Sequence, residues 1–171
     1  ATAGVRGVLC YEVTDRNGLA GGRAGLRENE RYLQARAATK ATAGARGAGR
    51  FAGLVGAHAA FTMADDTLAA TADLARRTGT GAHIHVAEDP CDDAICRSEY
   101  GAPLLNRLAA HGLLAAPHVL GHGTHLPAEA VARLGEAGAT MAHNTRSNMN
   151  NAVGYLQVKN VVGPLLLGTD G

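Results

Sequence analysis

Tryptophan is absent from this 171-residue sequence, and aromatic residues make up only 4% of it. The formal net charge is +1, and Lys and Arg form no basic stripe. The chain therefore offers neither a phosphate-binding face nor a base-stacking platform, and we expect no nucleic-acid partner. The longest apolar run, residues 161–167, is interrupted by Gly163 and Pro164. A membrane span needs ~20 apolar residues, so we expect no membrane partner either.

Cysteine is also scarce. Cys10, Cys91 and Cys96 are an odd number without CxxC spacing, which is typical of reduced thiols in a reducing compartment. No signal peptide is recognisable in the opening ATAGVRGVLCYEV, so the prediction is a cytoplasmic protein. The sequence lacks a starting Met and opens directly into a strand-like run, which favours a fragment of a longer chain.

Apolar residues are plentiful, at 46% of the sequence against 18% charged residues. This composition is that of a globular protein, and 171 residues are enough for one domain with its own core. We therefore predict a single domain over residues 1–171. Glycine, at 23 residues, is well above the usual ~7% but has no fixed period, which excludes collagen.

Short apolar runs alternate with helical patterns along the chain. The predicted strands are residues 4–13, 51–57, 82–88, 118–122, 139–144 and 163–171. Four helices are predicted. The first starts near residues 28–30 and runs to about Thr42, and the second begins with Asp65 as its N-cap. The third spans residues 100–111 after an acidic loop at 89–93, and the fourth covers residues 127–138 with Pro127 in its first turn.

Strands that are apolar on both faces and separated by helices indicate a parallel sheet covered by helices. Six such strands would suit a doubly wound sheet or most of a (β/α)8 barrel. No GxGxxG opens a helix after the first strand, so the sequence does not support a dinucleotide site.

Residues that bind metals or move protons follow several of these strands. They are His58, His85 with Glu88, His122, His143 with Asn144, and Asp170. In a closed parallel barrel the carboxyl ends of all strands meet at one rim, which is where active sites lie. This regularity favours the barrel and predicts that these side chains converge. Asp170 is the most informative, because a carboxylate at the end of a buried strand needs a cation or several donors.

Each of these residues also has a structural interpretation. His83 and His85 share one face of a strand and would equally suit two core imidazoles bonded to the backbone. Glu88 taken alone would suit a surface position. We interpret His125 as structural, and Cys91 and Cys96 as incidental, since C-x4-C alone is a weak zinc signal. The amide-rich run at residues 147–154 is either a polar loop or a loop that contacts a ligand.

Several motifs together resemble the amidohydrolase superfamily. They are HxHxxE at residues 83–88, GHGTHL at 121–126, AHNTRSNMNNAVG at 142–154 and LGTDG at 167–171. The resemblance is to the branch of cytosine and guanine deaminases and triazine hydrolases. CYEVTDRNG at residues 10–18 and GLRENERY at 25–32 are most similar to SsnA-type aminohydrolases. The motifs occur in order over essentially the whole chain.

The resemblance implies a (β/α)8 barrel, here about strands three to eight, that holds one divalent metal, Zn or alternatively Fe. It implies that His85 and Asp170 are metal ligands and that Asp170 also accepts a proton from water. Glu88 would protonate the substrate, and His122 would hydrogen-bond the attacking hydroxide. The residues that it places against substrate are His58, Asn144, Arg146 and Asn148. The implied partner is a small molecule, with a homodimer in the intact protein.

This sequence departs from the family pattern in one major respect. The HxH pair of ligands on the first barrel strand is not found before Val5, and no residues after Gly171 supply the last helix or the small β-domain. We therefore expect this polypeptide alone to be inactive, to bind metal weakly and to aggregate through open strand edges. Smaller departures are Gly123 where relatives often have Cys, and Thr145 where Pro is common.

Three functions remain open from the sequence. The first is an aminohydrolase that attacks a C–N bond of a nitrogen heterocycle with metal-activated water. The second is a hydrolase of the same kind that releases halide or thioether. The third is a degenerate, non-catalytic barrel that acts by binding alone.

Overall fold

A computed structural model describes residues 5–47 and 50–170, with the side chains of residues 40–47 left undescribed. Its strands are β1 (Gly7–Leu9), β2 (Phe51–Gly53), β3 (Val55–Ala59), β4 (Ala82–Val86), β5 (Val119–His122), β6 (Thr140–His143) and β7 (Leu165–Leu167). Its α-helices are α1 (Leu19–Gly47), α2 (Asp65–Thr78), α3 (Pro90–Tyr100), α4 (Leu104–Ala110), α5 (Ala128–Glu136) and α6 (Thr145–Asn150). Among these described helices, none combines the length and the apolar character that crossing a membrane requires.

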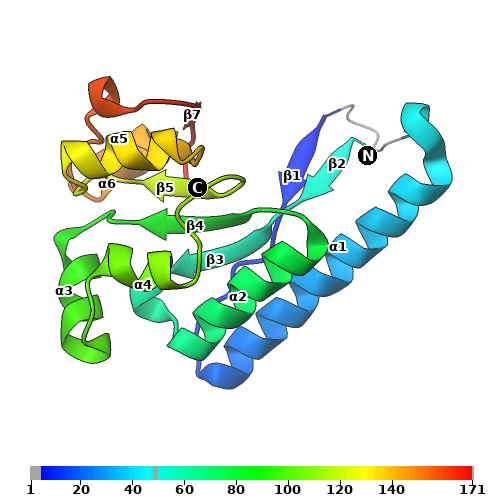
Figure 1. Cartoon of the computed structure of the whole chain (residues 1–171), viewed down its shortest axis with the longest axis horizontal. Coiled ribbons are helices and arrows are strands. Elements are labelled where there is room, and N and C mark those ends of the chain that lie inside the picture. The colour runs from blue at the N-terminus through cyan, green and yellow to red at the C-terminus, as the bar shows by residue number, and fades with distance from the viewer. Residues whose placement is uncertain (1–4, 48–49, 171) are drawn as a thin grey trace.

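The strands form a parallel α/β arrangement, as predicted. β3, β4, β5, β6 and β7 make one sheet in sequence order, and every neighbouring pair is parallel. Because parallel neighbours need a crossover, each strand returns through a helix or a long connection (Figure 1). β1 and β2 form a separate parallel pair, and an isolated bridge from Val13 to Ala57 continues this pairing onto β3.

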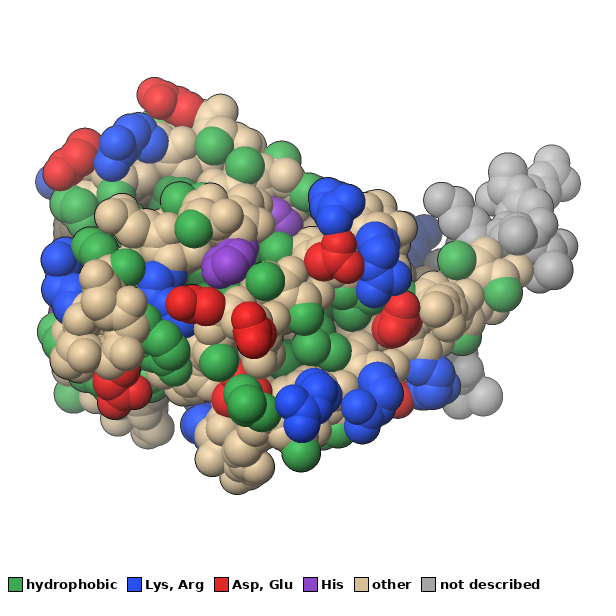
Figure 2. All heavy atoms as spheres, turned by 60° about the horizontal axis from the view of Figure 1, so that its bottom comes forward, with side chains coloured by type: hydrophobic (Ala, Val, Ile, Leu, Met, Phe, Trp, Pro, Cys, Tyr) green, Lys and Arg blue, Asp and Glu red, His purple; other side chains and the backbone are tan. Residues whose placement is uncertain are grey.

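The helices pack against the sheet through regularly spaced apolar residues. On α2, the buried side chains recur at three- and four-residue intervals: Thr67, Leu68, Thr71, Leu74 and Ala75. α5 buries Ala130, Val131 and Leu134 in the same pattern. Charges of both signs are mixed on the side of the molecule seen in Figure 2. Arg77 pairs with Asp73 on α2 and with Glu30 on α1.

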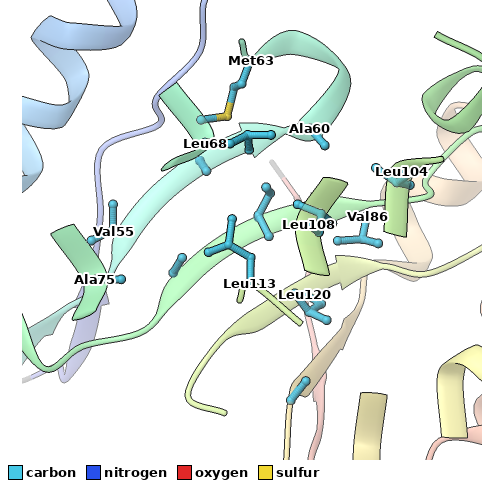
Figure 3. Packing of buried hydrophobic residues seen from close by; sticks show 14 of the residues in the cluster. Val55, Ala60, Met63, Leu68, Ala75, Val86, Leu104, Leu108, Leu113 and Leu120 are labelled. Carbon is cyan, nitrogen blue, oxygen red and sulfur yellow. The ribbon is translucent and has the colours of Figure 1, made fainter. Parts of the chain in front are cut away.

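The core lies between the sheet and these helices. Val86 and Leu120 on neighbouring strands, Leu108 on α4 and Leu113 after it are all fully buried and gather in one cluster (Figure 3). Burying a side chain of this size contributes roughly 1.5–3 kcal/mol. The core therefore fixes the positions of β4 and β5, the two strands whose ends carry His85 and His122.

The N-terminal third differs from the prediction in its boundaries. The helix predicted to start near residue 28 begins at Leu19, and the glycine-rich stretch through Gly25 is helical. The predicted strand 4–13 is β1 plus the single bridge at Val13, and its first residue lies outside the described part. The predicted strand 51–57 is two strands that break at Leu54. The high glycine content led to the wrong prediction of a loop through Gly25, because tertiary packing overrides the low helix propensity of glycine.

The acidic segment after β4 is helical rather than a loop. α3 starts at Pro90, and the side chain of Asp89 accepts a hydrogen bond from Cys91 N, so this segment has the N-cap and first-turn proline of a helix start. The helix predicted over residues 100–111 is the shorter α4. Asp65, predicted to be an N-cap, is the first residue of α2 after the N-cap Ala64. Pro127 occupies the N-cap position of α5 rather than its first turn.

Arg107 ties α4 to the turn that follows β3. This buried guanidinium donates to the carbonyl oxygens of Ala60 at 2.7 Å and Met63 at 2.9 Å, and pairs with Asp65 at 2.6 Å. It also stacks 3.5 Å from the ring centroid of Tyr100. Buried carbonyl groups need such partners, so Arg107 fixes the course of the chain just after His58.

His118 makes the folded state sensitive to acid. Its Nδ1 accepts from Ala82 N at 2.9 Å and its Nε2 donates to Gly112 O at 3.0 Å, which only the neutral ring can do. Burial holds the pKa of His118 below 6.5, while the bond to Gly112 opposes this shift. The unfolded chain thus binds more protons, and stability falls as the pH drops below about 6.5, by up to ~1.4 kcal/mol per pH unit for one proton. Urea unfolding followed by circular dichroism at pH 7.5 and 5 measures this loss.

Other buried histidines act in the same direction, so a variant must isolate His118. His118→Gln keeps one acceptor and one donor but has no proton to gain in this range. We expect the free energy of unfolding of His118→Gln to fall less between pH 7.5 and 5 than that of the wild type. Equal losses in the two proteins would show that His118 is not the sensitive group.

Candidate functional site

Four polar side chains meet beyond the carboxyl ends of β4, β5 and β7. His85 Nε2 lies 3.6 Å from Asp170 Oδ1, and His122 Nε2 lies 3.6 Å from both Asp170 Oδ2 and Glu88 Oε2. His122 is fully buried, whereas the side chains of His85, Glu88 and Asp170 keep 17%, 23% and 25% of their exposure. The site is therefore shielded but still open to a small molecule. The sequence predicted this convergence from the strand ends, and the structure brings these four residues together.

The backbone at this site is held in a rarely used conformation. Ala87, His122 and Asp170 have φ values of 49°, 67° and 57°, and only one other described non-glycine residue, Ala152, has a positive φ. The left-handed region costs a non-glycine residue about 1–2 kcal/mol. Such strain concentrates where a structure must aim particular side chains. Here it turns Glu88, His122 and Asp170 toward one another as their strands end.

Two glycines leave space for side chains of the site. A Cβ on Gly121 would lie 3.3 Å from His85 Cδ2. A Cβ on Gly168 would lie 2.2 Å from Asn144 Oδ1, which is a severe overlap. Gly121 therefore leaves room for the imidazole of His85, and Gly168 lets the chain approach Asn144 on its way to Asp170.

One face of α6 and its flanking residues supports the cluster. Asn144, Ser147, Asn148 and Asn151 are spaced at i, i+3, i+4 and i+7, so they share this face. Ser147 Oγ donates to Asp170 Oδ2 at 2.9 Å, and Asn151 Nδ2 donates to Glu88 Oε1 at 3.2 Å. Asn148 Oδ1 lies 2.8 Å from His122 Nδ1, and Asn144 Nδ2 lies 3.3 Å from His122 Nε2.

This face corrects part of the sequence analysis. The sequence predicts a polar or ligand-contacting loop over residues 147–154, whereas residues 145–150 are helical. Asn148 was expected to contact substrate, but it is fully buried behind His122, and its amide nitrogen donates to Thr124 Oγ1 at 3.1 Å. Ser147 and Asn151 were not singled out at all. Their helical spacing with Asn144 and Asn148 was the signal that could have identified them.

The imidazoles of His85 and its neighbour His83 favour their neutral forms. Burial holds the pKa of His85 below 6.5, the charge of Asp170 opposes this shift, and His122 adds to it. Burial also lowers the pKa of His83, whose ring centroid is 5.9 Å from that of His85. A neutral imidazole presents a lone pair, which is the form that binds a cation or accepts a proton.

Asp92 anchors the backbone next to Glu88. Its Oδ2 accepts a hydrogen bond from Glu88 N at 3.0 Å, and the side chain is buried at the start of α3. Burial raises the pKa of Asp92 to about 6, and the nearby charge of Glu88 contributes to this rise. Asp92 thus helps to set where the Glu88 side chain leaves the chain.

His58 borders the cluster from β3. Its ring centroid lies 5.5 Å from that of His85, and its Nδ1 is 2.9 Å from Thr62 Oγ1. Burial lowers the pKa of His58, and the positive charge of Arg16 lowers it further. Arg16, which pairs with Glu12 at 2.8 Å, is a cation close to the site that the sequence analysis did not single out.

The remaining predicted residues lie at the margin of the site. Arg146 is exposed on the outer side of α6, beside a surface hollow that Ser147, Asn151 and Asp170 also line. His143 is buried, and its ring packs 6.5 Å from that of Tyr155 instead of joining the cluster. His125 Nε2 is 2.8 Å from Val153 O, in keeping with a structural role.

The donor set suits one divalent cation. The ligand atoms of His85, Glu88 and His122 all lie within 4.8 Å of one another, and both oxygens of Asp170 adjoin them. Two ligands held at about 2.1 Å in a tetrahedron lie ~3.4 Å apart, close to the 3.6 Å separations found here. Imidazole and carboxylate donors suit zinc and iron alike, so the cluster does not select between them.

Comparison with known sequences gives one family and several related enzymes. The profile of the Amidohydrolase family matches residues 1–171. The 5-methylthioadenosine/S-adenosylhomocysteine deaminase of Caldanaerobacter subterraneus subsp. tengcongensis is 34% identical over 126 residues, which cover 72% of this chain and 29% of that protein. The 8-oxoguanine deaminase of Pseudomonas aeruginosa is 32% identical over 114 residues, covering 65% and 25%. The 5'-deoxyadenosine deaminase of Methanosarcina barkeri is 29% identical and covers 99% of this chain and 38% of that protein.

Solved structures share the fold. An adenosine deaminase from Xanthomonas campestris with bound zinc superposes with a TM-score of 0.82 at 22% identity, covering 97% of this chain and 37% of that one. A guanine deaminase from C. acetobutylicum, with guanine in its active site, gives 0.76 at 15% identity and covers 97% and 39%. This chain therefore spans between a quarter and two-fifths of the length of the proteins it matches.

Proposed function

This chain belongs to the amidohydrolase family, and we propose on that basis that it is part of a metal-dependent aminohydrolase that acts on a C–N bond of a nitrogen heterocycle. The observation that carries the proposal is the convergence of His85, Glu88, His122 and Asp170 at the carboxyl ends of parallel strands. Two imidazoles and two carboxylates there can hold a cation and still move protons in both directions.

We propose further that residues 1–171 form one section, about strands three to eight, of a (β/α)8 barrel. The proteins that it matches are about two and a half times as long, and the sheet of β3 to β7 is open. In this proposal, His85 and Asp170 are two of the metal ligands, and further ligands come from elsewhere in the intact protein. The section alone would bind metal weakly and be inactive, because tetrahedral zinc in a catalytic site takes three protein ligands.

The cation, zinc or iron, would supply a Lewis acid that lowers the pKa of water toward ~7. Asp170 is placed to accept the proton that water loses when it adds to the electrophilic carbon of an amidine-like ring. His122 Nε2 is placed to hydrogen-bond the attacking oxygen. Glu88 would give a proton to the ring nitrogen. Asp170 would then pass the proton it took from water to the exocyclic amine, so that the C–N bond breaks and ammonia leaves, while the hydroxyl proton of the adduct returns to Glu88 as the carbonyl forms.

The substrate would be a small heterocycle that carries an exocyclic amino group. Relatives named as deaminases of 5'-deoxyadenosine, 5-methylthioadenosine and 8-oxoguanine support an aminopurine or its nucleoside. His58, at the edge of the cluster, and Asn144, whose amide reaches His122, are proposed to border the substrate, with Arg146 at the outer margin. We propose that the intact protein is cytoplasmic and acts as a homodimer.

The experiment is a substrate panel on the intact protein loaded with zinc. The panel contains an adenine nucleoside, an oxopurine with an amino group and a chlorotriazine, and each reaction is scored for ammonia and for chloride. Ammonia from either purine supports the proposal. Chloride without ammonia would replace it with dehalogenation, and no turnover of any member, with zinc bound, would favour the binding-only alternative.

A further inference from the structure

We propose that Asn148 is a positioning residue that fixes the proton of His122 on Nδ1, so that Nε2 is the ring nitrogen left to act within the site. This inference rests on the proposed function for its catalytic meaning. Its structural content, which tautomer His122 adopts, does not depend on the reaction.

The contact is buried on both sides. His122 and Asn148 are each 0% exposed, and Asn148 Oδ1 lies 2.8 Å from His122 Nδ1. An amide oxygen can only accept, so Nδ1 must carry the hydrogen. A donor and acceptor buried together in this way are costly to separate, because neither can turn to water.

The other ring nitrogen is set by what surrounds it. Asn144 Nδ2 lies 3.3 Å from His122 Nε2 and is a donor, so it also favours a lone pair there. Glu88 Oε2 and Asp170 Oδ2, each 3.6 Å away, face the same nitrogen and oppose this preference, because a carboxylate favours a proton on the nitrogen that it faces. Two amides on one helix face therefore favour the same tautomer from opposite sides of the ring, and that tautomer can accept a proton or a hydrogen bond inside the site.

Thr124 is the second hydrogen-bond partner of the Asn148 amide. Asn148 Nδ2 donates to Thr124 Oγ1 at 3.1 Å, which leaves Oδ1 for His122. Rotating the amide by half a turn would point its NH2 group at Nδ1 and favour the opposite tautomer. His122 itself leaves the strand with a φ of 67°, so the contact also holds the ring against a strained backbone.

The direct test is the ¹⁵N NMR spectrum of histidine-labelled protein, with the His122 signals assigned by their loss in His122→Gln. We expect the metal-free wild type at pH 8 to show Nδ1 protonated and Nε2 bare. Asn148→Leu removes the acceptor and should shift His122 toward Nε2 protonation. Asn148→Asp keeps an accepting oxygen and should retain the Nδ1–H form. A wild-type spectrum with Nε2 protonated would overturn the inference without touching the proposed function.

Kinetics on the intact zinc enzyme give the second measurement. We expect Asn148→Leu to lower kcat by about 10- to 100-fold with little change in KM, and Asn148→Asp to recover most of the loss. The matched control is Asn106→Leu, the same change at an exposed position of α4, which should leave kcat unchanged. Unchanged kcat in Asn148→Leu would overturn the inference. Should Asn148→Leu fail to fold, the wild-type and Asn148→Asp spectra still decide it.

Discussion

Replacing Asp170 by asparagine in the intact, zinc-loaded protein is expected to lower kcat/KM for ammonia release by at least about a thousandfold, or ~4 kcal/mol of transition-state stabilisation. Asparagine has nearly the same shape and could still accept from Ser147. It carries no negative charge, however, and cannot take up a proton at neutral pH. The carboxylate lies 3.6 Å from both His85 Nε2 and His122 Nε2, so its charge affects metal binding and proton transfer together.

Zinc analysis and steady-state kinetics on the same preparation separate these two effects. Glu88→Gln should retain its zinc and still lose at least about a hundredfold in kcat, because it removes a proton donor. The control is Asp66→Asn, the same chemical change at an exposed position of α2, which should behave as wild type. Full activity in both Asp170→Asn and Glu88→Gln would remove the roles proposed for these residues.

Replacing Asn29 by leucine is expected to destabilise the fold by about 4 kcal/mol. The Asn29 side chain is 1% exposed, and each of its two polar atoms makes two hydrogen bonds. Its Oδ1 accepts from Tyr11 N and Gly56 N, and its Nδ2 donates to Tyr11 O and Gly25 O. Leucine has a similar size but would leave these backbone groups unpaired, and each such loss costs about 1–3 kcal/mol. Relaxation of the surrounding chain would reduce the total loss of stability.

Urea unfolding followed by circular dichroism measures this loss, since the chain has no tryptophan to report by fluorescence. Asn29→Asp keeps the two accepting contacts but not the donating ones, so it should fall between leucine and the wild type. Glu28→Ala, which removes an exposed partner of Arg31 on the same helix, should leave the free energy of unfolding close to that of the wild type. If Asn29→Leu lowered the free energy of unfolding no more than Glu28→Ala does, Asn29 would not be the residue that holds the backbone at Tyr11 and Gly56 together.

The sequence predicted the part of the site that follows from strand ends. Apolar runs place β4, β5 and β7 within a few residues, and His85, His122 and Asp170 follow at their carboxyl ends. Parallel pairing then brings these ends to one edge, whatever the loops do. The roles of these residues stay predictions, because proximity alone does not separate a metal ligand from a proton donor.

The sequence predicted poorly wherever tertiary contacts override local preference. Gly22 and Gly25 suggested a loop but lie within α1, where a Cβ on Gly22 would overlap Asp15 and one on Gly25 would crowd Val13. The polar run after β6 suggested a loop because it has no apolar face. Its helical spacing serves hydrogen bonds to the site instead, a pattern that hydrophobic periodicity cannot detect.

The spacing along α6 also limits how this segment can change in length. Each residue of an α-helix advances by about 100°, so one insertion between Asn144 and Ser147 would rotate every later side chain off the shared face. Ser147, Asn148 and Asn151 would then release Asp170, His122 and Glu88 in a single event. Substitutions at the exposed Met149 would be tolerated, whereas insertions and deletions would not. In a random library of this segment, active clones should therefore vary in composition but keep one length.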